Sequence, residues 1–214
     1  MSIGVAREEI DRECEQLLEC WRSLLRNETW RNHLEGKVAT YFAAMQSRDD
    51  RKQKYKIRAI HDKLGYEAKE DGLCRGAIFR TEKFIKTTNR SGTKSKGQTV
   101  HIEHTVPIAE LDRQLRSRFY GRSAEGVEFL LNFSVCSAFN ITEKSIAVPR
   151  GYNSKTDAFN AGHVDQSKPF RRYKPLFESG AVIWNVFDKV PVNPDSFDFD
   201  EHGDVVHRLI GHCS

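Results

Sequence analysis

The clearest chemical feature of the sequence is the pair Glu103 and His104, which lies near the end of the run 98–107. A glutamate carboxylate is a hard oxygen ligand of the kind that Mg²⁺ prefers. An imidazole titrates near neutral pH, so it can take up and release a proton under physiological conditions. The pair therefore predicts a site at which a bound cation and a general base act on one substrate.

Two strands and a helix are predicted to position this pair. Apolar and polar side chains alternate from 98 to 107, which is typical of a strand that ends at its proline. Residues 145–148 form a short apolar run that favours a second strand. Pro149 suits the first turn of a helix over 150–160. This helix would carry Asn153 and Lys155.

This arrangement resembles the HNH endonucleases, whose core is a ββα-metal unit. The family pattern on the first strand is an acidic residue, a histidine, two further residues and a proline, which here is the run Glu103-His104-Thr105-Val106-Pro107. An asparagine or histidine follows on the helix, and the run Asn153-Ser154-Lys155 is similar to HNH domains of modification-dependent restriction enzymes. The resemblance covers residues 98–162. The chain departs from the family in the long separation of 49 positions from His104 to Asn153 and in having no paired zinc-binding cysteines.

The resemblance implies a role for each of these residues. His104 would be the general base that takes a proton from the attacking water, while Glu103 and Asn153 would hold Mg²⁺ or Mn²⁺. Asn140 would brace the loop at the site, or would itself be the metal-side residue in place of Asn153. Two further side chains have open roles: His101 supports the site or is a surface histidine, and Lys155 contacts phosphate or braces the fold.

Positive charge is concentrated in the middle of the chain. The whole chain has 34 Lys and Arg against 30 Asp and Glu, but residues 48–96 have 15 against 7 and residues 113–174 have 11 against 5. This distribution fits a face that binds a polyanion, although an ordinary solvated surface would give the same pattern. The basic residues that flank the candidate site in sequence are predicted to contact phosphate: Lys83, Lys86, Arg90, Lys94, Lys96, Arg171, Arg172 and Lys174.

The predicted fold class is α+β. Apolar residues recur at helical spacing in the N-terminal third, which predicts helices over 6–27, from about 30 to 45, and over 50–64. Beyond Gly72 the pattern becomes mixed, with an extended segment at 77–87, helices at 108–120 and 124–133, and an acidic loop at 193–204. We therefore predict a helical region over 1–72, followed by an HNH-like nuclease domain over 73–214 with helical insertions.

Composition narrows the function further. The sequence has no apolar run long enough to span a membrane, no apolar segment typical of a secretory signal, and five cysteines without a Cys-x-x-Cys pair. We therefore expect a cytoplasmic protein without a membrane partner. The predicted function is metal-dependent cleavage of DNA, as in a restriction or defence nuclease. The alternatives are a ribonuclease of toxin type on the same core and a basic DNA-binding protein without catalysis. Oligomeric state, monomer or homodimer, is left open.

Overall fold

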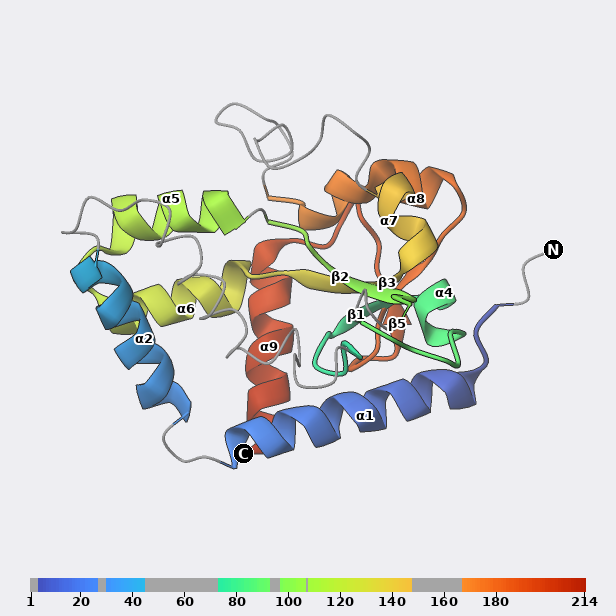
Figure 1. The fold of residues 1–214 in the computed structure, drawn as a ribbon, viewed down its shortest axis with the longest axis horizontal. Helices are drawn as coiled ribbons and strands as arrows, with labels where there is room; N and C mark the ends of the chain where they lie inside the picture. The colour runs from blue at the N-terminus through green and yellow to red at the C-terminus, as the bar shows by residue number, and fades with distance from the viewer. Residues whose placement is uncertain (1–3, 27–29, 45–72, 93–96, 107, 148–166) are drawn as a thin grey trace.

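A mixed five-stranded sheet lies at the centre of the fold and is surrounded by helices (Figure 1). The computed structural model describes residues 4–26, 30–44, 73–92, 97–106, 108–147 and 167–214. The strands lie in the order β2 (Val100–His104), β3 (Cys136–Asn140), β1 (Phe79–Thr81), β4 (Ile183–Asn185) and β5 (Val190–Pro191). Strands β1 and β3 are parallel, and the other neighbouring strands are antiparallel. The predicted α+β class is confirmed.

The strand predicted over 98–107 is confirmed as β2, but its partner is not the predicted one. Residues 145–148 were expected to form the second strand, and this is wrong: α7 (Lys144–Ala147) covers most of that run, and Ile146 is exposed. The partner is β3, whose residues from Cys136 to Phe139 are all buried. Its small and apolar side chains fill both faces of the sheet. The Asn140 side chain then caps the 3₁₀ turn η2 (Ile141–Glu143), and this turn ends the strand.

A helical hairpin connects β2 to β3. Helix α5 (Ile108–Phe119) and helix α6 (Ser123–Phe133) match the predicted helices closely, because each carries apolar side chains along one face. The α6 helix packs against α2 (Trp30–Ala44) on one side and α9 (Phe199–Cys213) on the other. Figure 1 shows this helical layer extending from one end of the sheet. The hairpin thus forms the long connection between the two antiparallel strands β2 and β3.

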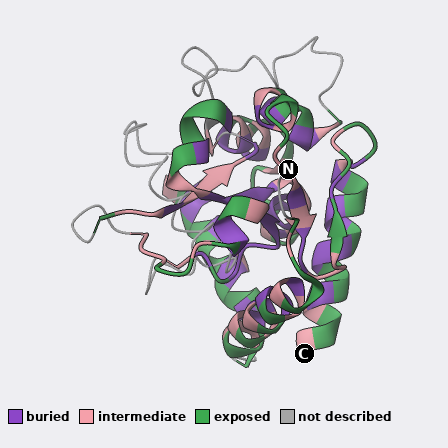
Figure 2. Ribbon diagram, turned by 90° about the vertical axis from the view of Figure 1, so that its right-hand side faces the viewer, coloured by how far each residue is buried: buried purple, intermediate pink, exposed green. Residues whose placement is uncertain are grey.

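The N-terminal helices belong to the same core as the sheet. Helix α1 (Arg7–Leu25) buries one face against α9, and α2 buries its face against α6, as their apolar spacing predicted. The indole of Trp21 donates a hydrogen bond to the carbonyl of Gly76 at 3.1 Å. The predicted helices over 50–64 and 150–160, and the domain boundary at residue 72, lie outside the described residues. Figure 2 shows buried residues gathered in the interior and exposed residues on the outer surfaces of the helices.

Two segments form more helix than their sequences indicated. Residues 77–87 were expected to be extended, but β1 has only three residues before the Thr81 hydroxyl caps helix α4 (Glu82–Ile85). The acidic run 193–204 was expected to be a loop, but α9 begins within it at Phe199. The Asp198 carboxylate accepts the backbone N–H of Glu201 at 2.9 Å and caps this helix. Acidic residues at a helix start satisfy its unpaired N–H groups, so a negative run can begin a helix.

A buried ion cluster attaches α1 to the sheet. The carboxylate of Glu13, on α1, is fully buried and pairs with Arg80 of β1 and with Arg90, whose Nη2 lies 2.5 Å from Oε1. Arg80 also donates from Nε to the carbonyl of Ala77 at 2.9 Å. The guanidinium of Arg90 stacks on the ring of Phe84 at 4.2 Å. Every charge in the cluster thus has an internal partner.

His202 of α9 is a buried neutral imidazole in the core. Its Nδ1 lies 2.7 Å from the carbonyl oxygen of Asn132, and its ring lies 5.8 Å from that of Phe79. Burial lowers the pKa of His202 to about 4, because the charged form is poorly solvated there and the hydrogen bond to Asn132 only partly compensates.

Acidification is therefore expected to destabilise the protein through His202. Because the pKa is lower in the folded protein than in the unfolded chain, the unfolded chain binds the proton first. The stability that the neutral His202 contributes is fully present above about pH 6.5 and is lost as the pH falls toward 4. The free energy of unfolding should fall by about 3 kcal/mol over this interval. Denaturant melts at several pH values test this. His202→Asn keeps a donor for Asn132 and should lose less stability over the same interval; an equal loss in both proteins would contradict the prediction.

Candidate functional site

The candidate site lies at the end of the edge strand β2. His104 pairs with Cys136 of β3 and Glu103 pairs with Ser137, so the ladder is regular through both residues. Successive side chains in a regular strand point to opposite faces, so Glu103 and His104 lie on opposite faces of β2. The chain bends at Thr105 and Val106, just beyond the histidine.

Glu103 lies in a positively charged environment. Its Oε2 is 3.2 Å from Nε2 of His101 on the same face of β2, and its Oε1 is 3.7 Å from Nη2 of Arg172. Burial raises the pKa of the Glu103 carboxyl, but the hydrogen bond from His101 and the charges of His101, Arg172 and His104 together outweigh it, so the pKa is lowered. Glu103 is therefore an anion at neutral pH. The structure places His101 beside the candidate carboxylate, which is the position that the first of its two open roles, support of the site, requires.

The turn η3 (Pro169–Tyr173) covers this face of β2. Arg172 donates from Nη1 to the carbonyl of Thr105 at 3.1 Å, and the hydroxyls of Thr105 and Tyr173 lie 3.0 Å apart. Burial and the nearby negative charge of Glu103 raise the pKa of Tyr173 well above its usual value, so the phenol stays protonated. Neither Tyr173 nor Thr105 was predicted as a site residue, because residues 68 positions apart meet only through the fold.

His104 is half-buried on the opposite face. Its Nδ1 lies 3.1 Å from Sγ of Cys136, the residue directly across the ladder. This contact fixes the plane of the imidazole, and it leaves Nε2 at the far side of the ring. Cys136 was not predicted as a site residue because β3 was not expected at this position.

The structure separates Asn140 from the candidate carboxylate. Asn140 pairs with Val100 at the other end of the ladder, three positions or about 10 Å along the strand from the partner of Glu103. Its amide accepts the N–H of Thr142 and donates to the hydroxyl of Thr87 at 2.9 Å. The structure therefore does not bring Asn140 to Glu103, and the hydrogen bonds of its side chain hold the turn after β3 instead. Asn153 and Lys155 lie outside the described residues.

Two of the predicted phosphate contacts have internal roles instead. Arg90 is bound to Glu13 and Phe84, and Arg172 is buried against Glu103 and Thr105, so neither guanidinium faces a ligand outside the protein. Both predictions are corrected, because their charges are neutralised within the fold. Lys83 is exposed on α4, and Lys86 is exposed at the C-cap of this helix. Arg171 pairs with Asp195 at 3.1 Å at the surface, and the exposed Lys174 lies 3.7 Å from Glu178. Lys94 and Lys96 lie outside the described residues.

The ligands for a divalent cation are partly present. Among the described residues, no three His, Cys, Asp or Glu side chains gather as a metal cluster. Glu103 and His101 together offer one carboxylate and one imidazole nitrogen. Mg²⁺ in proteins commonly keeps several waters and takes only one or two carboxylates, so this pair fits part of such a ligand set. A full set needs oxygen donors from the substrate or from residues such as Asn153.

Comparisons of the chain with protein families, with curated proteins and with solved structures found no match. No helix in the described ranges is both long and apolar enough to cross a membrane.

Proposed function

We propose that this protein is a metal-dependent endonuclease that hydrolyses DNA phosphodiester bonds, in the manner of a restriction or defence nuclease with an HNH-like core. One observation carries the proposal: an ionised carboxylate, Glu103, and a half-buried imidazole, His104, lie on opposite faces at the end of one edge strand. Strand β2 pairs antiparallel with β3, and the short helix α7 follows β3 after the turn η2, so a ββα unit would here carry the hairpin of α5 and α6 as an insertion between its strands.

The opposite placement of the two groups suits hydrolysis of a phosphodiester. In an in-line displacement the attacking oxygen and the leaving oxygen are on opposite sides of phosphorus. A base and a carboxylate on opposite sides of one strand end can serve these two positions if the backbone of the substrate crosses that end. A protein that only binds DNA needs neither group.

The chemistry of His104 then follows from its contacts. Nδ1 of His104 is in contact with Cys136 Sγ, and in the tautomer in which Nδ1–H is the donor, Nε2 is the nitrogen that would take a proton from water. The resulting hydroxide oxygen bonds to phosphorus, and the bond from phosphorus to the 3′ oxygen breaks. The leaving oxygen then takes a proton from solvent. The products are a 5′ phosphate and a 3′ hydroxyl.

Glu103 and Asn153 are the residues that would hold the cation. When bound, a divalent ion supplies positive charge that stabilises the charge developing on the phosphoryl oxygens and on the leaving oxygen. His101 and Arg172 hold the Glu103 carboxylate in place and keep it ionised. Arg172 therefore supports the site through Glu103 and not through the phosphate.

The decisive experiment is cleavage of a supercoiled plasmid by purified protein with Mg²⁺, with Mn²⁺ and with EDTA. We expect cleavage with either metal and none with EDTA. Glu103→Gln keeps the shape and a hydrogen-bond acceptor for His101 but removes the anionic ligand, so cleavage should fall by about 10²-fold or more, a loss of several kcal/mol of transition-state stabilisation.

Glu178→Gln, on the surface of α8 (Lys174–Glu178), is the matched control and should cut like the wild type. Cleavage that persists in EDTA, or a fully active Glu103→Gln, would refute the proposal. Cleavage of a structured RNA, measured in a parallel series, distinguishes the DNA endonuclease from the ribonuclease alternative. Preferential cleavage of the RNA would identify the ribonuclease. DNA binding without cleavage of either nucleic acid identifies the non-catalytic one.

A further inference from the structure

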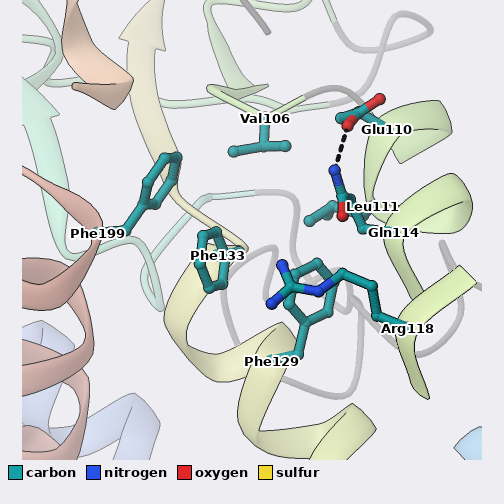
Figure 3. Close-up of a pocket in the computed structure, with 8 residues that line it drawn as sticks. All are labelled: Val106, Glu110, Leu111, Gln114, Arg118, Phe129, Phe133 and Phe199. Atoms are coloured by element: carbon teal, nitrogen blue, oxygen red, sulfur yellow. Dashed lines mark hydrogen bonds between the residues drawn. The ribbon is translucent and has the colours of Figure 1, made fainter. Parts of the chain in front are cut away.

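A pocket opens just beyond the candidate site, where the chain leaves β2. Its volume is about 160 Å³, and Val106, two residues after His104, forms part of its wall. The remaining walls come from α5, α6 and α9, and Figure 3 shows their side chains converging on one space. Pockets for whole drug-sized ligands measure about 300–1,000 Å³, so this one has room for a single planar ring system.

Phenylalanine rings form one side of this pocket. The rings of Phe129 and Phe133 are stacked at 4.9 Å, and Phe133 lies 4.7 Å from Phe199 of α9. All three line the pocket, and Phe133 is half-buried at its wall. Aromatic faces of this kind attract another flat π-system by offset stacking or edge contact.

The opposite side of the pocket is polar and rich in acceptors. Gln114 donates from Nε2 to Oε1 of Glu110 at 2.9 Å, which leaves the amide carbonyl of Gln114 as an acceptor. Burial raises the pKa of the Glu110 carboxyl, but the hydrogen bonds from Arg113 and Gln114 outweigh this effect. The pKa is therefore lowered, and Glu110 is an anion at neutral pH. The exposed Arg118, which also lines the pocket, extends from the same helix in the direction of Phe129 (Figure 3).

We propose that this pocket receives one nucleobase that has left the base stack of the DNA substrate, and that it prefers bases with an exocyclic amino group. The proposal rests on the proposed nuclease function, which brings a DNA backbone to His104. Flat phenylalanine faces fit the base, and Arg118 fits the adjoining phosphate. The acceptors of Glu110 and Gln114 match the amino groups of cytosine, adenine and guanine, whereas thymine offers no such donor.

An unstacked base also explains why an aromatic pocket lies next to a phosphate-cleaving site. Enzymes that act on nucleic acids hold extruded bases by stacking, and the energetic cost of extrusion is smallest where the base is already unpaired. A base held in this pocket would fix the position of the strand relative to Glu103 and His104. The preferred substrate is then DNA with an unpaired or weakly paired base.

The test uses fluorescently labelled duplexes with one bulged nucleotide, which is cytosine, adenine, thymine or an abasic residue. Binding is measured by anisotropy in EDTA, so that no cleavage occurs. The cytosine and adenine bulges should bind about 5- to 150-fold tighter than the abasic bulge, the range that base–aromatic stacking supplies, and the thymine bulge should lie between them. Phe133→Leu keeps an apolar side chain but removes the ring, so the advantage over the abasic bulge should disappear.

Phe177→Leu is the matched control, because Phe177 is also a half-buried phenylalanine but lies on α8, outside the pocket. It should keep the wild-type ratio. Equal binding of abasic and cytosine bulges by the wild type, an unchanged ratio in Phe133→Leu, or no binding of any duplex would overturn the pocket assignment. The plasmid assay tests the nuclease function separately. Plasmid cleavage without a preference for bulged bases would refute only the base-binding pocket, and a preference for bulged bases without cleavage would refute only the nuclease function.

Discussion

His104→Ala is expected to lose cleavage by about 10²- to 10⁴-fold, the usual contribution of a positioned general base. This corresponds to about 3–5 kcal/mol in the activation barrier. Affinity for DNA should survive, because phosphate contacts come from lysines and arginines elsewhere on the surface. The fold should survive as well, since the ring is only half-buried and lies at the end of the strand.

The measurement needs cleavage rate, DNA affinity and melting temperature on one preparation of each protein. His33→Ala is the control, because His33 is exposed on α2, away from the strand. His101→Ala is unsuitable as a control, because the structure places this imidazole against Glu103. A folded, DNA-binding His104→Ala that still cuts at the wild-type rate would eliminate the mechanism. Joint loss of stability, binding and cleavage would identify His104 as a structural residue.

Glu13→Gln is expected to give the largest loss of stability. The substitution leaves Arg80 fully buried with its charge uncompensated, because no other carboxylate contacts it among the described residues. Removing one partner of a buried ion pair typically costs about 3–5 kcal/mol. This is a large share of the 5–15 kcal/mol or so that stabilises an ordinary domain.

Chemical denaturation of matched variants checks this expectation. Glu19→Gln, on an exposed face of the same helix, should change the free energy of unfolding by less than about 0.5 kcal/mol. Arg90→Ala should cost less than Glu13→Gln, because it leaves the pair of Glu13 and Arg80 intact. If the free energy of unfolding of Glu13→Gln lies within about 1 kcal/mol of the wild-type value, the buried ion cluster does not hold α1 to the sheet.

Sequence periodicity was sufficient for four of the long helices, but α9 (Phe199–Cys213) was not predicted. The spacing of Ile10, Cys14, Leu17 and Trp21 predicted α1, and similar spacing predicted α2, α5 and α6, because each helix buries one continuous face. The short elements were less predictable. Strand β3 is buried on both faces and so has no alternation, and α4 depends on one capping threonine. Tertiary packing decides such segments.

The candidate site was predictable only along β2. Glu103, His104 and His101 are local in sequence, so their types and spacing are visible there. The contacts of Cys136, Arg172 and Tyr173 depend on strand register and on the placement of η3, which no local pattern encodes. The roles of Arg90 and Arg172 were misassigned for the same reason. A basic residue beside a loop looks like a phosphate contact until its internal carboxylate partner is known.

In the described part of the chain, β2 is bound to the sheet along one side only, through β3. A strand with a single neighbour can detach locally at a lower free energy than global unfolding requires, and its amide protons exchange with solvent through that opening. Detachment would move His104 away from Cys136 and Glu103 away from Arg172, while the contacts of α1, α6 and α9 stayed formed. The candidate chemistry would then be available only while the strand is docked, so that activity and hydrogen-exchange protection of β2 would rise and fall together, independently of the melting temperature.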